Sequence, residues 1–92
     1  MNSRVPVALE WPENQQGHIH SENAHTRTVN FYGCLLVCPE AMPLELRLRL
    51  TNLTNHRTIG AVVVYQGNQR VDGWELGVEL IEPDMDFWGI DL

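Results

Sequence analysis

The chain has 92 residues, enough for one compact domain and too few for two separate hydrophobic cores. Its formal net charge is −6, and its six basic residues, all arginines, are scattered along the sequence. Binding to DNA or duplex RNA requires clustered cations, so this composition argues against both partners. A small nucleotide remains open, because one or two arginines can hold a phosphate through paired hydrogen bonds.

Hydropathy argues against a membrane protein. The sequence contains no run of eighteen apolar residues that would span a bilayer. Its first residues, MNSRVPVALEW, lack the long apolar region of a secretory signal. We therefore expect a soluble, cytoplasmic domain without a membrane partner.

Alternation with a period of two residues dominates the sequence. The clearest example is LELRLRL at 44–50, where leucines alternate with Glu45, Arg47 and Arg49. On a strand, the leucines share one face and the charged residues the other. By the same pattern we expect six strands, over Val5–Trp11, Ala24–Phe31, Cys34–Val37, Leu44–Leu50, Thr58–Tyr65 and Trp74–Ile81.

The connections follow from turn-forming residues. We expect residues 13–23 to form a loop and QGNQRVDG, at 66–73, to form the loop of a hairpin. The run Val62–Val64 suggests a strand buried on both faces. Near the end of the chain, Asp84 is a candidate cap for one short helical turn that carries Phe87 and Trp88.

Six short strands and scarce helix predict an all-β protein with one domain over residues 1–92. The spacing favours a small six-stranded antiparallel β-barrel, because closure hides the edges that an open sheet would expose to aggregation. An unrelated barrel of the OB type is the alternative architecture.

The two cysteines predict reduced thiols. Cys34 and Cys38 lie four residues apart in an apolar run, which on a strand puts them on one face about 13 Å apart. This separation is too long for a disulfide, so we expect two free, buried or half-buried thiols without a redox or metal role.

His18 and His20 form an H-x-H pair, a spacing that can place two imidazoles on one strand face. A metal site needs a third or fourth ligand, and His25 and Cys34 are the nearest candidates in the sequence. Nothing in the sequence brings these four residues together. We therefore expect solvated histidines and no metal.

Catalysis is not expected. A cysteine in an apolar run has a raised thiol pKa and is a poor nucleophile. The sequence has neither a serine in a nucleophile elbow nor a glycine-rich phosphate loop. We expect a non-enzymatic domain that needs no cofactor.

The acidic and aromatic C-terminal tail has two interpretations. Phe87 and Trp88 either close one end of the barrel or lie exposed as a docking patch for a protein partner, where aromatic residues are favoured. Solvent accessibility of Trp88 separates the two.

Several segments together resemble a PilZ domain. These are SRVPVALEW near the start, RTVNFYGCLLV at 27–37, a valine-rich strand, and GWELGVELIEP near the end. The resemblance covers nearly the whole chain in order. It implies a small β-barrel that binds the bacterial second messenger cyclic di-GMP and takes part in bacterial signalling.

The resemblance also assigns ligand-binding residues. Family members use an N-terminal R-x-x-x-R and a [DN]-x-S-x-x-G motif on the barrel. Arg4 matches the second arginine, and the first would precede Met1. Thr28 takes the acidic or amide position, Asn30 the serine position and Gly33 the glycine position.

These departures predict weakened binding. Each charge-assisted hydrogen bond from an arginine is worth about 1.5–3 kcal/mol, so one missing arginine costs one to two decades of affinity. The expected function is therefore a non-catalytic signalling or adaptor domain of the cyclic di-GMP effector type, with ligand binding weakened or lost. The alternatives are a protein-interaction module that binds no nucleotide and the unrelated OB-like binding barrel.

Overall fold

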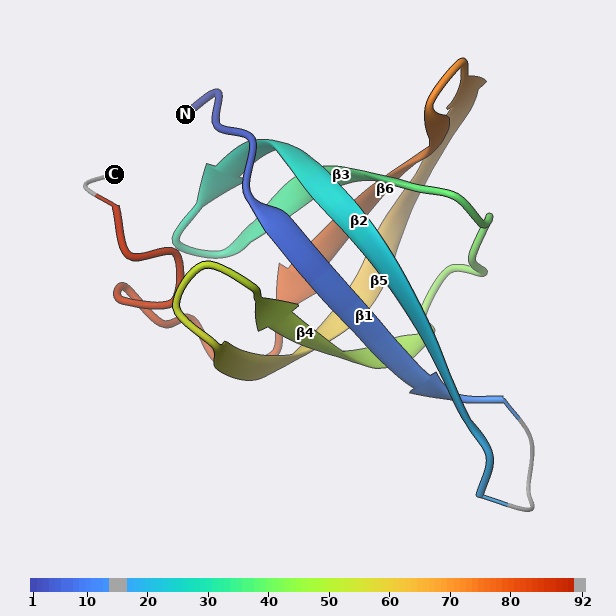
Figure 1. The fold of residues 1–92 in the computed structure, drawn as a ribbon, viewed down its shortest axis with the longest axis horizontal. Helices are drawn as coiled ribbons and strands as arrows, with labels where there is room; N and C mark the ends of the chain where they lie inside the picture. Colours follow the sequence, from blue (N-terminus) through green and yellow to red (C-terminus); the bar gives the residue numbers. More distant parts are fainter. Residues whose placement is uncertain (14–16, 91–92) are drawn as a thin grey trace.

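The structure is a computed structural model that describes residues 1–13 and 17–90. Within these residues, six antiparallel strands close into a barrel in the order β1-β2-β3-β6-β5-β4 (Figure 1). The strands are β1 (Pro6–Pro12), β2 (Ile19–Asn30), β3 (Gly33–Cys38), β4 (Arg47–Asn52), β5 (Arg57–Arg70) and β6 (Gly73–Leu80). The expected fold class is confirmed, and the six strands and full closure differ from the five-stranded, partly open OB-fold.

Alternating apolar residues build the core. In β4, Leu48 and Leu50 point inward and are buried, whereas the alternating Arg47 and Arg49 are exposed. The other strands contribute their own inward-facing set, which includes Val7, Leu9, Val29, Leu36, Ala61, Val63, Leu76, Val78 and Leu80. Burial of one face of every strand sets the register, since a slip of one residue would turn polar side chains inward.

Two hairpins are longer than the sequence predicted. The loop expected over 13–23 is wrong from Ile19 onward, because β2 begins there and pairs with β1 as far as Pro12. Likewise the hairpin expected at QGNQRVDG forms, but its loop is only Val71 and Asp72, because β5 continues to Arg70 and pairs with Gly73 of β6. Both extensions are polar arms that project from the barrel (Figure 1), so no apolar pattern marked them as strands.

The start of β4 and the middle of β5 also differ from expectation. Leu44 is exposed and lies in a turn, where Glu45 has a positive φ of 68°, so the strand begins only at Arg47. Of the three valines Val62–Val64 in β5, only Val63 is fully buried, whereas Val64 is 51% exposed. The β5 strand is therefore buried on one face there, with a register shift between Val63 and Tyr65.

The prediction of two free, buried cysteines is confirmed. Cys34 and Cys38 both lie on β3 and are free and buried. Burial raises the pKa of the Cys34 thiol well above its usual range. Burial also raises the pKa of Cys38, and the nearby carboxylates of Glu22 and Glu40 act in the same direction. These effects together outweigh a backbone hydrogen bond at Glu40, which lowers this pKa. Both thiols are therefore held in the protonated, unreactive form.

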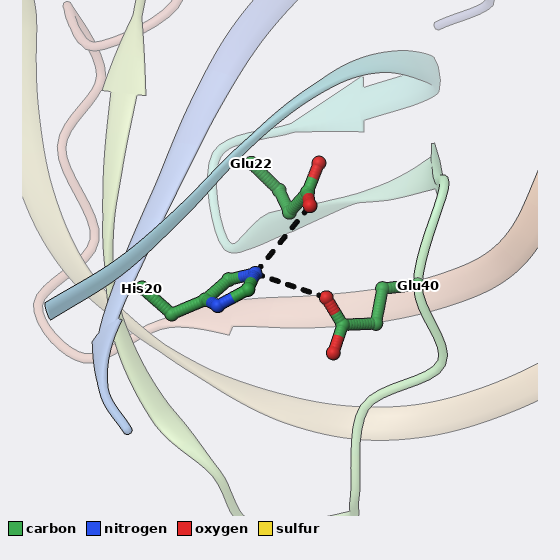
Figure 2. A group of neighbouring side chains, drawn as sticks. All are labelled: His20, Glu22 and Glu40. Atoms are coloured by element: carbon green, nitrogen blue, oxygen red, sulfur yellow. Dashed lines mark hydrogen bonds and ion pairs between the residues drawn. The ribbon is translucent and has the colours of Figure 1, made fainter. Parts of the chain in front are cut away.

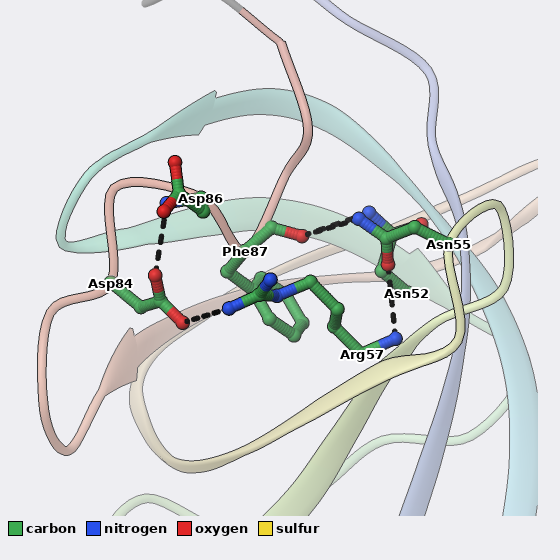
Figure 3. Close-up of polar contacts among 6 residues, drawn as sticks. All are labelled: Asn52, Asn55, Arg57, Asp84, Asp86 and Phe87. Atoms are coloured by element: carbon green, nitrogen blue, oxygen red, sulfur yellow. Dashed lines mark hydrogen bonds and ion pairs between the residues drawn. The ribbon is translucent and has the colours of Figure 1, made fainter.

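The C-terminal tail closes one end of the barrel without forming a helix. The helical turn expected at Asp84 does not form. The described residues contain no helix, and therefore no helix that could cross a membrane. Instead Asp84 forms a turn. Its side chain accepts a hydrogen bond from Asp86 N (Figure 3). Its carbonyl accepts one from Phe87 N. Phe87 and Trp88 are 1% and 3% exposed and pack edge to face.

A polar network holds this tail in place. The buried Asn52 at the end of β4 donates to the carbonyls of Phe87 and Trp88 at 3.1 and 3.3 Å. Asn55 also donates to the Phe87 carbonyl (Figure 3). The burial contradicts the expectation of an exposed docking patch at Phe87 and Trp88 and agrees with the barrel-closing interpretation.

Candidate functional site

An irregularity in β2 brings two arginines together. The pairing of β2 with β3 shifts between Thr26 and Thr28, which leaves Arg27 as an extra residue in a β-bulge. A bulge bends its strand and redirects its side chain. The Arg27 carbonyl accepts a hydrogen bond from Ser3 N, so the bulge lies directly against the N-terminal segment that carries Arg4.

The N-terminal segment is fixed to the barrel along β2. The buried Thr26 hydroxyl donates to the Ser3 carbonyl at 2.6 Å and accepts from Val5 N at 2.8 Å. Met1 adds backbone hydrogen bonds to Val29, and Asn2 bridges to Thr28. Residues 1–5 therefore lie alongside β2 and are held to it by backbone hydrogen bonds.

A surface hollow of about 540 Å³ opens where this segment meets β2. Arg4, Arg27 and Thr28 line it, together with His25 and Asp72. Both arginines are exposed, and no carboxylate among the described residues forms an ion pair with either. The Asp72 carboxylate instead faces His25 Nε2 at 3.6 Å.

Two of the four residues that the resemblance assigned to ligand binding, Arg4 and Thr28, line this hollow. Thr28 also lines a second, adjoining hollow with Asn30 and Gly33. Each of the four candidates therefore lines one or both of the two hollows, and Thr28 is shared by them, although Gly33 is buried. Arg27, which motif matching did not single out, faces the same hollow as Arg4.

Asn30 has a structural role in the turn between β2 and β3. Its Oδ1 accepts hydrogen bonds from Tyr32 N at 2.8 Å and Gly33 N at 3.0 Å. Its carbonyl accepts one from Trp88 Nε1 at 2.9 Å. The side-chain oxygen is therefore committed to the turn, and only the amide nitrogen is left for a ligand.

The packing of β3 against β6 also explains the glycine at position 33. A Cβ at this position would overlap the carbonyl oxygen of Val78 on β6. Only glycine lets β3 and β6 approach this closely, and the backbone there does not have a positive φ. The glycine of the motif is thus explained by strand packing alone.

A separate polar cluster surrounds His20. Its Nε2 lies 3.0 Å from Glu40 Oε2 and 3.4 Å from Glu22 Oε1 (Figure 2), and its Nδ1 lies 3.5 Å from Glu13 Oε1. His25 and Cys34, the partners considered from the sequence, are not part of it. Partial burial lowers the pKa of His20, but Glu22, Glu40 and Glu13 outweigh it and raise that pKa above its ordinary value.

The fold and these two surfaces define a small closed antiparallel barrel with polar sites on its outside. Comparison with protein-family models, with curated proteins and with solved structures finds no significant match to this chain. Functional conclusions therefore rest on the geometry of its own residues.

Proposed function

We propose that the chain is a non-catalytic signalling or adaptor domain of the cyclic di-GMP effector type, with weakened ligand binding. One observation carries the proposal: Arg4 and Arg27, both without a carboxylate partner in the described residues, line the same hollow. The PilZ-like arrangement of the sequence motivates the choice of ligand.

The chemistry of the hollow suits a phosphate-bearing ligand. Two guanidinium groups offer two charges and several hydrogen-bond donors, which matches the two phosphate charges of cyclic di-GMP. The Thr28 hydroxyl can donate or accept one further bond. Arg27 on β2 supplies a second arginine to the hollow that Arg4 lines. We propose that it takes the place of the first arginine of the family's N-terminal motif.

Other features weaken the binding. Asp72 also lines the hollow and repels an anion, and the whole chain carries a net charge of −6. Asn30 has already used its side-chain oxygen in the turn. We therefore expect weak affinity that falls as salt is added, because exposed charges are screened.

Isothermal titration of the chain with cyclic di-GMP tests this proposal. At about 50 µM protein, we expect measurable binding of one ligand per chain. Arg4→Ala and Arg27→Ala each remove charge-assisted hydrogen bonds and should lower the affinity about tenfold or more. Arg49→Ala, which removes an exposed arginine on the outer face of β4, is the matched control and should leave binding unchanged.

Two outcomes contradict the proposal. One is the absence of heat at these concentrations in low salt. The other is a loss of affinity in Arg49→Ala as large as that in Arg4→Ala or Arg27→Ala, which would indicate general attraction to arginine.

A second candidate function is a protein-interaction module that binds no nucleotide. The observation that favours it is a group of exposed apolar side chains near the adjoining hollow: Tyr32 is 65%, Val64 51% and Tyr65 49% exposed. Failure of the titration would favour this second function, with the docking surface there instead of at the buried Phe87 and Trp88.

A further inference from the structure

The cluster around His20 joins two segments that are distant in the sequence. His20 and Glu22 lie two residues apart on β2, so both side chains point to the same side of the strand. Glu40 comes from the connection that follows β3 and reaches toward them (Figure 2). The three side chains are 28%, 29% and 50% exposed, so the cluster is open to ions from solvent.

The spacing of the three side chains fits a small metal ion. Zinc binds nitrogen and oxygen ligands at about 2.0–2.1 Å, which in a tetrahedron separates neighbouring ligand atoms by about 3.3 Å. The two separations from His20 Nε2, 3.0 Å to Glu40 and 3.4 Å to Glu22, lie close to this value. All three ligand atoms lie within 4.8 Å of one another, so side-chain adjustment alone would complete the site.

The imidazole is held from its other side. Glu13 Oε1 faces Nδ1, the ring nitrogen that points away from the two carboxylates, at 3.5 Å. A carboxylate in this position is the usual outer partner of a metal-binding histidine, where it fixes the tautomer and the direction of the ring. The ring also packs on Trp11, with the ring centroids 4.6 Å apart. Nε2 is therefore directed toward Glu22 and Glu40 before any ion arrives.

The charge balance also suits a cation. When His20 is neutral, Glu22 and Glu40 carry two negative charges that no arginine among the described residues neutralises. A divalent ion would balance them. One imidazole with two carboxylates favours zinc or a related transition metal over Mg²⁺ or Ca²⁺, which prefer larger sets of oxygen ligands.

We propose that His20, Glu22 and Glu40 form a binding site for a divalent transition-metal ion of the zinc type, with the fourth position open to water. Glu13 is the positioning residue behind the imidazole. Because its ligands come from β2 and from the connection after β3, the bound ion would clamp the projecting β1–β2 hairpin to that connection.

Titration of the metal-free chain with Zn²⁺ tests the proposal. We expect one ion per chain, and a higher thermal unfolding temperature with Zn²⁺ because the ion binds only the folded site. His20→Gln and Glu40→Gln should each weaken binding at least tenfold and abolish the thermal shift. Glu13→Gln should weaken binding about tenfold.

Glu79→Gln, which removes an exposed carboxylate on β6 away from the cluster, is the matched control and should behave as the unaltered chain. Co²⁺ provides an independent readout, since its visible absorption reports coordination and should be lost in His20→Gln. The substituted side chains are partly exposed and of similar size, and circular dichroism checks that each variant is folded.

Three results would overturn the proposal. The first is no Zn²⁺ binding at about 100 µM, which would make the cluster an ion-pair network around a protonated His20. The second is equal affinity in the unaltered chain, His20→Gln and Glu40→Gln, which would place the ion elsewhere. The third is a loss of affinity in Glu79→Gln as large as that in Glu40→Gln, which would indicate unspecific attraction to carboxylates.

Discussion

Gly33 and Asn30 show how a residue pattern can have two physical causes. In the sequence both fall at positions of a ligand-binding motif, where Gly33 keeps the glycine and Asn30 replaces the serine. In the structure, Gly33 permits close contact between β3 and β6, and Asn30 closes the turn before it. Each residue would be required here even without a ligand. At the residue scale, the candidate site therefore depends most on Arg4, Arg27 and Thr28.

The substitution Gly33→Ala should strongly destabilise the barrel. Its Cβ would overlap the rigid Val78 carbonyl, and relief of that overlap requires the backbones of β3 and β6 to separate. We expect a loss of about 3 kcal/mol in the free energy of unfolding, measured by urea denaturation.

Gly60→Ala is the control for this prediction. A Cβ at Gly60 would meet only the flexible end of Ile81, at 3.2 Å, and its effect should stay below about 1 kcal/mol. Equal stabilities of the two variants would contradict the packing role of Gly33.

At the scale of elements, all six strands could be predicted from the sequence, but the polar ends of β2 and β5 could not. Leu48 and Leu50 alternate with arginines, so the sequence predicts which face of β4 is buried. The turn at Leu44 and Glu45 makes the strand begin later than predicted. The projecting ends of β2 and β5 bury little, so no hydrophobic period marks them. The bulge at Arg27 depends on the partner strand and leaves no local signal.

The metal-site cluster was hidden for a similar reason. The spacing of His18 and His20 indicates a candidate ligand pair in the sequence. Glu40, however, lies twenty residues after His20 and is brought close to it only by the path of the chain after β3. A pattern within one segment cannot reveal such a pair.

The tail is the element whose anchoring is easiest to test. Asn52→Ala removes both amide hydrogen bonds to the tail and leaves the carbonyls of Phe87 and Trp88 with fewer partners. Because Asn52 is fully buried, we expect a loss of about 2–3 kcal/mol in the free energy of unfolding. Urea denaturation measures it.

Thr51→Ala is the matched control on the same strand. Thr51 bonds to Thr58 on the outside of the barrel, and its loss should cost less than about 1 kcal/mol. If both variants were equally stable, Asn52 would not anchor the tail.

For binding, the arrangement of charge over the whole molecule matters more than its sum. The chain is acidic overall, yet Arg4 and Arg27 form one small area where no described carboxylate pairs with either arginine. Carboxylates gather instead around His20. Phe87 and Trp88 are buried in the core, so neither side chain is available for binding. The molecule thus offers separate places for an anion and for a cation.

The most direct test of this account is an amide NMR titration of the chain with cyclic di-GMP. The account predicts chemical-shift changes centred on Asn2–Arg4 and His25–Thr28, and none at Arg47 or Arg49 on β4. Arg27→Ala should suppress these changes. No shift at millimolar ligand, or shifts centred on β4, would contradict the account.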